Sequence, residues 1–245
     1  MDVLSAAILG VVQGLTEFLP VSSSGHLVLA QSLIPGFKQP GIVFDVILHL
    51  GTLFAVLYFF RKKIFKLGFK YYGLIAVGTI PAILLGLVFK SQIEALFVSV
   101  KLVGAALILS GILNYLTNGA KVGKKAVGVK ESLMVGVAQA AAIIPGLSRS
   151  GSTIFAGIKQ GVKPEEAVEF SFLLSIPAIL GANILELAGR GFNGSLSSGS
   201  YVAGFVTAFI SGFLAIGLVL KFLVSKKFKF FAVYCIGLGI LALLL

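Results

Sequence analysis

The sequence is poor in charged residues. Asp, Glu, Lys and Arg make up only 12% of its 245 residues, whereas 58% are hydrophobic. A soluble domain of this size needs a far larger polar surface, so a soluble fold is excluded. The mean hydropathy is +1.05, and apolar residues are spread over the whole length. We therefore predict an all-α polytopic membrane protein with a single membrane domain, residues 1–245.

Cysteine and acidic residues are also scarce. The single cysteine, Cys235, excludes an internal disulfide. The first ten residues, MDVLSAAILG, contain no basic residue, so we do not predict a cleaved signal peptide. The net charge is +11, but the basic residues form short clusters between apolar runs, as they do in cytoplasmic loops. No nucleic-acid partner is therefore expected.

Six apolar runs approach the length of about 20 residues that crosses a bilayer. They are residues 42–60, 73–89, 100–117, 166–188, 201–224 and 229–245. Two other apolar stretches are broken by polar residues: 3–34 at Pro20 to His26 (the first tip), and 132–158 at Pro145 to Thr153 (the second tip). Each half is too short to cross, so we expect two re-entrant helical hairpins, since lipid tolerates non-helical backbone only where protein or a cavity covers it.

The two broken stretches resemble each other. GVVQ begins at Gly10 and GVAQ at Gly136, and Ser22 and Ser148 in the two tips are likewise 126 residues apart. This spacing predicts repeat one at about 1–126 and repeat two at about 127–245, each a hairpin followed by three spans. Because three crossings turn the second repeat over, we expect inverted repeats whose tips meet near the midplane, where such folds place their site.

The distribution of basic residues orients this arrangement. It puts fifteen basic residues on one side and four on the other, with Arg149 in a tip. The richer side is predicted to be cytoplasmic. It receives the clusters within 61–70, 121–130, 159–163 and 221–229. Both termini and the mouth of the first hairpin then face outside.

Polar and charged side chains concentrate at the two breaks. The first offers Gln13, Glu17, Ser22, Ser23, Ser24 and His26, and the second Ser148, Arg149, Ser150, Ser152 and Thr153. Arg149 offers a planar donor fork suited to phosphate, and a half-helix that starts near Ser148 has free N–H groups that bind anions. Glu17, with Gln13, suits a hard divalent cation. This set favours phosphoryl transfer on a membrane-embedded phosphate ester.

Other interpretations of the same residues stay open at this point. Serines in apolar helices usually serve close packing, His26 could bond a carbonyl, and Arg149 could be a structural counterion of Glu17. His49 lies in a regular span and is taken as structural or pore-lining. The main rival function is a transporter or flippase of a polyprenyl phosphate lipid, since broken helices in inverted repeats are typical of transporters. A weaker rival is a non-catalytic membrane scaffold.

At these residues the sequence resembles the undecaprenyl-diphosphate phosphatase family, also called the bacitracin-resistance protein. The matching segments are QGLTEFLPVSSSGH (Gln13 to His26), PGLSRSGST (Pro145 to Thr153) and EFSFLLSIP (Glu169 to Pro177). The likeness covers nearly the whole chain. It implies a bacterial plasma-membrane enzyme that hydrolyses undecaprenyl diphosphate to undecaprenyl phosphate and inorganic phosphate. That reaction recycles the lipid carrier for peptidoglycan synthesis and confers bacitracin resistance, and the implied site opens to the outer face.

The resemblance also implies roles for individual residues. The family's acidic pair falls on Gln13 and Glu17, the first being glutamate in some members, and we expect this pair to bind Mg²⁺ or Ca²⁺. Its essential serine and histidine fall on Ser23 and His26. The nucleophile stays open between these two residues and water.

The second motif of the family carries the phosphate-binding roles. It falls on Ser148, Arg149 and Thr153, and we expect these residues, together with Ser150, to hold the phosphates of the substrate. Arg149 would also stabilise transition-state charge. The polyprenyl diphosphate lipid would enter sideways from the bilayer. The oligomeric state is left open, a homodimer included.

Overall fold

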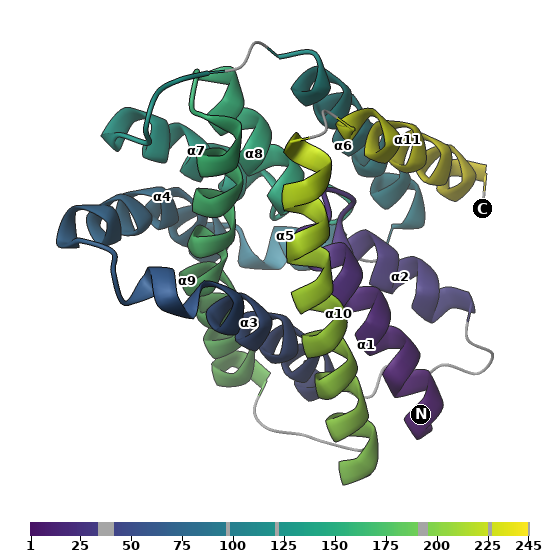
Figure 1. The fold of residues 1–245 in the computed structure, drawn as a ribbon. Helices are drawn as coiled ribbons and strands as arrows, with labels where there is room; N and C mark the ends of the chain where they lie inside the picture. The colour runs from purple at the N-terminus through teal and green to yellow at the C-terminus, as the bar shows by residue number, and fades with distance from the viewer. Residues whose placement is uncertain (34–41, 97–98, 121–122, 191–195, 225–226, 245) are drawn as a thin grey trace.

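The computed structural model describes residues 1–33, 42–96, 99–120, 123–190, 196–224 and 227–244. The regular structure of these residues is helical, apart from one isolated bridge between Lys125 and Val162. In chain order (Figure 1) the helices are α1 (Val3–Phe18), α2 (Ser23–Leu33), α3 (Ile42–Ile64), α4 (Phe69–Val88), α5 (Lys90–Leu96), α6 (Val100–Asn118), α7 (Val129–Ala141), α8 (Arg149–Lys159), α9 (Pro164–Arg190), α10 (Ser198–Val224) and α11 (Phe228–Leu244). The predicted all-α class is confirmed.

Five of the described helices are long and apolar enough to cross a membrane, judged by length and composition. They are α3, α4, α6, α9 and α10. Each corresponds to one of the predicted spans, and α4 ends one residue before the end of the span predicted at 73–89. The sixth predicted span, residues 229–245, corresponds to α11, which is apolar but has 17 residues. These helices agree with a polytopic membrane protein.

Each interrupted stretch forms two shorter helices joined by a bend. Residues 19–22 join α1 to α2, and residues 142–148 join α7 to α8. The backbone turns sharply at Ser22, with φ of 71°, and at Gly146, with φ of 91°. Glycine adopts this left-handed conformation freely, but in a residue with a side chain it costs roughly 1–2 kcal/mol. The first bend is therefore strained at Ser22, and the contacts around it must hold it in place.

The hairpins pack against helices from the opposite half of the chain. Helix α1 lies along α10, and α7 lies along α4. A methyl group added at Gly10 would come within 2.4 Å of the carbonyl oxygen of Gly204, and one added at Gly136 within 2.4 Å of that of Gly78. Only glycine allows such a close approach of two backbones. Gly10 and Gly136, which are 126 residues apart in the two predicted repeats, thus allow each hairpin to pack closely on its partner helix.

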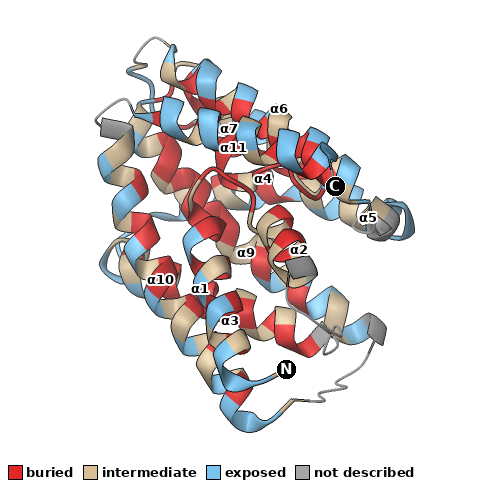
Figure 2. Ribbon diagram, turned by 90° about the vertical axis from the view of Figure 1, so that its right-hand side faces the viewer, coloured by how far each residue is buried: buried red, intermediate tan, exposed pale blue. Residues whose placement is uncertain are grey.

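Aromatic side chains fill the centre of the bundle. The rings of Phe18 on α1 and Phe172 on α9 meet edge to face, with centroids 5.3 Å apart, and Phe60 of α3 packs beside them. Figure 2 shows buried residues facing the inside of the bundle and exposed residues on its periphery. Many exposed residues are large and apolar, among them Leu84 on α4 and Val233 on α11. Such a periphery suits contact with lipid and would be a liability in water.

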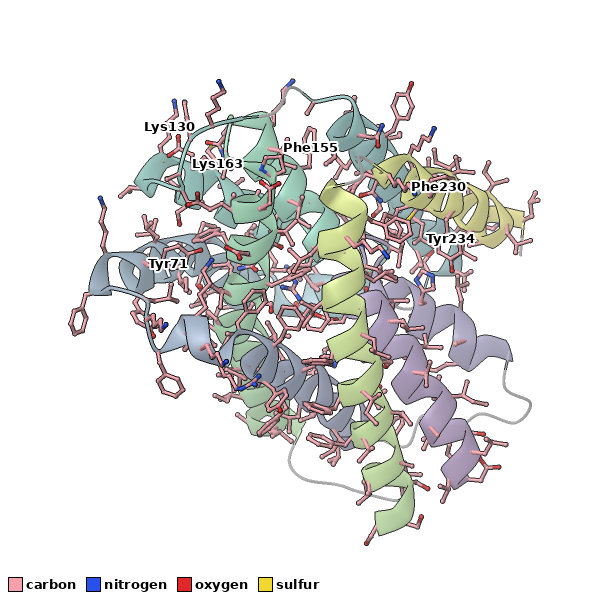
Figure 3. All side chains as sticks on the ribbon, viewed as in Figure 1. Tyr71, Lys130, Phe155, Lys163, Phe230 and Tyr234 are labelled. Carbon is pink, nitrogen blue, oxygen red and sulfur yellow. The ribbon has the colours of Figure 1, made fainter. Side chains whose placement is uncertain are left out.

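Residues of the four basic clusters contact one another or segments next to another cluster. Their contacts are a backbone hydrogen bond from Lys125 to Gly161, the ion pair of Lys63 with Glu169, and a hydrogen bond from the Lys229 N–H to Asn118 Oδ1. Lys130 and Lys163 lie at the same edge of the molecule in Figure 3. The N-terminus lies far from this edge (Figure 1).

Candidate active site

The carboxylate of Glu17 is the centre of a hydrogen-bonded cluster where the two tips meet. Glu17 is 8% exposed. Its Oε1 accepts a 2.6 Å bond from Nη2 of Arg149. Its Oε2 accepts bonds from the Ser23 hydroxyl at 2.6 Å and from Nε2 of Gln13 at 3.0 Å. The structure thus brings four of the predicted site residues together on one carboxylate.

Local folding explains why these four side chains converge. Gln13 and Glu17 are four residues apart on α1, so they share a face. Ser23 and Arg149 are the first residues of α2 and α8, and they are 126 residues apart, the spacing of the sequence repeat. Two helices therefore begin beside the same acid. The partial positive charges of their N-termini favour an anion between them.

The two tips also have the same internal hydrogen bonds. Ser22 caps α2, its hydroxyl accepting from the Gly25 N–H at 3.4 Å, and Ser148 caps α8, accepting from the Gly151 N–H at 3.1 Å. The Ser22 hydroxyl lies 3.3 Å from that of Ser24. The hydroxyls of Ser148 and Ser150, 126 residues later in the chain, lie 3.2 Å apart. The repeated sequence therefore builds a repeated turn.

The predicted phosphate-binding hydroxyls of the second tip already have protein partners. The Ser150 hydroxyl donates to the Leu19 carbonyl at 3.0 Å, which ties the second hairpin to the first. Thr153 Oγ1 lies 2.6 Å from the hydroxyl of Ser171 and donates to the Arg149 carbonyl at 2.8 Å. With the capping role of Ser148, these contacts explain why all three side chains are buried. Phosphate binding by them stays a prediction.

His26 lies one turn of α2 beyond Ser23 and has different neighbours. Its Nδ1 is 2.7 Å from the Ser22 carbonyl oxygen, and its Nε2 is 2.7 Å from the hydroxyl of Tyr234 on α11. Since a carbonyl can only accept, Nδ1 carries the proton and Nε2 accepts from the tyrosine. Sequence reasoning weighed a carbonyl contact for His26, and the structure contains one. It did not foresee Tyr234.

Three further polar residues around the tips were missed from the sequence. Asn114 is fully buried and donates to the Pro20 carbonyl at 2.6 Å. Ser110, one turn earlier on α6, accepts from the Ser148 N–H at 2.8 Å and donates to the Gly146 carbonyl at 3.0 Å. Ser171 bonds Thr153 from α9. The signal for Ser110 and Asn114 was their four-residue spacing in an apolar span, which puts them on one face.

His49, on α3, bonds back onto its own helix. Its Nδ1 lies 2.8 Å from the Asp45 carbonyl oxygen, one turn earlier on α3. Of the two roles considered from the sequence, this contact fits a structural one, and a pore-lining role stays a prediction.

The oxygen atoms around Glu17 suit a hard cation. Gln13 Oε1 is buried and lacks a hydrogen-bond partner among the described residues, and its amide also bonds the Glu17 carboxylate. Across the described ranges, no three His, Cys, Asp or Glu side chains form a metal-binding group. Mg²⁺ needs no such group, because it commonly binds one or two carboxylates together with substrate phosphates and water. Gln13 and Glu17 therefore fit the predicted cation.

Comparison with known proteins gives a consistent result over the full length of the chain. A family model described as "Bacitracin resistance protein BacA" matches residues 6–241. The undecaprenyl-diphosphatase of Methanobrevibacter smithii is 42% identical, covering 98% of this chain and 96% of the relative. That of Desulforapulum autotrophicum is also 42% identical, covering 100% and 98%. Undecaprenyl-diphosphatase 3 of Bacillus cereus is 41% identical, covering 100% and 98%.

Proposed function

Because the chain belongs to the bacitracin resistance protein BacA family, we propose that it hydrolyses undecaprenyl diphosphate where its two tips meet. Family and relatives agree on the activity, so the chain is an undecaprenyl-diphosphatase. The product, undecaprenyl phosphate, is the lipid carrier for peptidoglycan synthesis. The resemblance predicted from the two motifs is confirmed, and the transporter alternative is not favoured.

One observation carries the location of the site. The Glu17 carboxylate, from the first hairpin, bonds both the Ser23 hydroxyl and the Arg149 guanidinium of the second hairpin. A hydroxyl bonded to a base that a third group orients is the usual arrangement of an activated nucleophile. We therefore assign Ser23 as the nucleophile and Glu17 as the base that takes its proton.

The reaction follows in two balanced steps. Ser23 Oγ bonds to the terminal phosphorus as its proton passes to Glu17, and the bond to the bridging oxygen breaks to release undecaprenyl phosphate. Water then attacks the phosphorus of the phosphoserine while the proton on Glu17 returns to Ser23 Oγ, and inorganic phosphate leaves with the oxygen and the protons of the water. Arg149 and the N-termini of α2 and α8 stabilise charge on the phosphoryl oxygens. His26 transfers protons through Nε2, the unprotonated nitrogen, which accepts from the Tyr234 hydroxyl in the structure.

A divalent cation, Mg²⁺ or Ca²⁺, fits this assignment as an additional charge-neutralising group. Gln13 Oε1 and a Glu17 oxygen would hold it, with the diphosphate as a further ligand. When bound, it would neutralise part of the diphosphate charge. Helix α1 holds the Gln13 amide and the Glu17 carboxylate side by side, with Nε2 of Gln13 3.0 Å from Oε2 of Glu17.

We also propose the membrane arrangement that the charge pattern favours. The side that carries the basic clusters faces the cytoplasm, and the first hairpin opens to the outer face of the bacterial plasma membrane. Helices α1–α2 and α7–α8 are the re-entrant hairpins of two inverted repeats, about 1–126 and 127–245. Support comes from their short length, from the matched turns and from the crossed packing on α10 and α4. The diphosphate lipid enters sideways between helices.

A phosphate-release assay tests the proposal. The full chain, purified in detergent, is incubated with polyprenyl diphosphates of different chain lengths, with Mg²⁺, with Ca²⁺ or with a chelator. We expect phosphate release that needs a divalent cation, and its loss in Ser23→Ala while the neighbouring Ser24→Ala retains most of it. Full turnover by Ser23→Ala would overturn the assigned nucleophile. Mass measurement of the same sample decides whether the protein is a homodimer.

A further inference from the structure

The ring of Tyr234 holds the imidazole of His26 in place. Tyr234 lies on α11, 208 residues from His26 in the chain, and its hydroxyl is 2.7 Å from Nε2. It extends from α11 toward α2 (Figure 3). We propose that Tyr234 is a positioning residue of the active site, which holds the His26 ring in one orientation by donating to Nε2. This inference rests on the proposed function, since it gives His26 a proton to move.

The hydrogen bonds at the two ring nitrogens determine the tautomer. Nδ1 donates to the Ser22 carbonyl at 2.7 Å, so it carries the proton. Nε2 is then left with a lone pair, which the Tyr234 hydroxyl occupies as donor. The partner of one imidazole nitrogen sets the protonation of the other. With both nitrogens engaged, neither ring rotation nor tautomer exchange is free.

Ring packing adds to the orientation. The rings of His26 and Tyr234 are stacked, with centroids 5.5 Å apart and planes inclined by 14°. The Ser22 carbonyl also accepts the His26 backbone N–H, at 3.2 Å. Ser22 is the strained residue of the first bend. The imidazole is therefore held between a constrained turn in the first repeat and a helix at the end of the second.

This arrangement gives the hydroxyl and the ring of Tyr234 separate effects. The ring supplies packing that any aromatic residue of similar shape retains, whereas only the hydroxyl can donate to Nε2. Tyr234→Phe therefore removes the hydrogen bond at Nε2 and keeps the stack. Loss of one neutral hydrogen bond corresponds to about a fivefold effect. We expect it in kcat, because the bond acts on the proton-transferring group and not on the lipid.

The test compares Tyr234→Phe with Tyr115→Phe, which alters an exposed tyrosine on α6. For the first variant we expect kcat to fall about fivefold with KM within about twofold, and for the second no change. The chain has only two histidines, so ¹⁵N-histidine NMR of the full chain in detergent resolves their ring nitrogens, and a His49→Gln sample assigns them. The Nε2 resonance of His26 should move in Tyr234→Phe alone.

Two results would overturn the inference. One is a Tyr234→Phe protein whose His26 nitrogen resonances match the wild type. The other is a kcat equal to that of the wild type within twofold. Failure of the proposed function is separately visible, because it would appear as absence of phosphate release by the wild type. In that case the NMR comparison still decides whether the Tyr234 hydroxyl bonds His26 Nε2.

Discussion

Arg149→Lys keeps a positive charge beside Glu17 and removes the planar guanidinium. In the structure Nη2 bonds Glu17 Oε1 at 2.6 Å, and Nη1 reaches the Ser171 carbonyl at 3.4 Å. A lysine ammonium group lacks the planar fork that lets Arg149 bond the Glu17 carboxylate and reach the Ser171 carbonyl at the same time. Because the charge of the ion pair survives, we expect the protein to remain folded. Because one donor to the phosphoryl group is lost, we expect kcat to fall about 100-fold.

The assay is phosphate release from the lipid diphosphate by purified full-length variants, with thermal unfolding measured on the same samples. Arg61→Lys is the matched control. Arg61 is exposed at the end of α3, where it donates to the Tyr58 carbonyl and lies over the Tyr58 ring. That control should keep turnover within about twofold, since surface substitutions are usually near neutral. If Arg149→Lys retained more than half of wild-type turnover, the phosphate-clamping role would be refuted.

Gln13→Glu should remain active and reach half-maximal phosphate release at a lower Mg²⁺ concentration, because it adds a carboxylate beside Glu17; a folded but inactive variant would contradict the cation site. Chelation should abolish phosphate release and added Mg²⁺ should restore it, whereas undiminished release in excess chelator would exclude a cation. Gly10→Ala should lower the free energy of unfolding by about 1–3 kcal/mol, because its methyl would lie 2.4 Å from a backbone oxygen of α10. Gly237→Ala, with nothing within 4 Å, should not, and equal unfolding temperatures of the two variants would argue against the close helix contact.

The interruptions at Pro20 to His26 and at Pro145 to Thr153 could be predicted because proline, glycine and serine break an apolar period locally. The contact between Glu17 and Arg149 could also be predicted from the sequence. Two opposite charges in an apolar chain must find each other or a ligand, and both outcomes were considered. The structure contains the direct ion pair at 2.6 Å.

The partners of the tips were harder to predict, because they come from distant helices. Asn114 and Tyr234 reach the first tip from α6 and α11. Which face of such a helix points inward depends on its rotation in the bundle. The spacing of Ser110 and Asn114 marks one face of α6 but not the partner of that face, and α11, which is apolar all round, carries no periodic signal. The buried hydroxyls of Ser148 and Thr153 show the same limit. Their residue types suited phosphate, but only the packing revealed the protein groups that they bond.

The crossed packing of the hairpins has a consequence for synthesis of the chain. Glu17 leaves the ribosome 132 residues before Arg149, its counter-charge, and α1 is made long before α10, the helix that covers it. The first hairpin therefore stays incompletely covered until most of the remaining protein has been translated and inserted. Assembly ends with the late helices closing over the earliest ones, so a chain cut at its midpoint would leave the buried Glu17 without Arg149 as a neutralising neighbour.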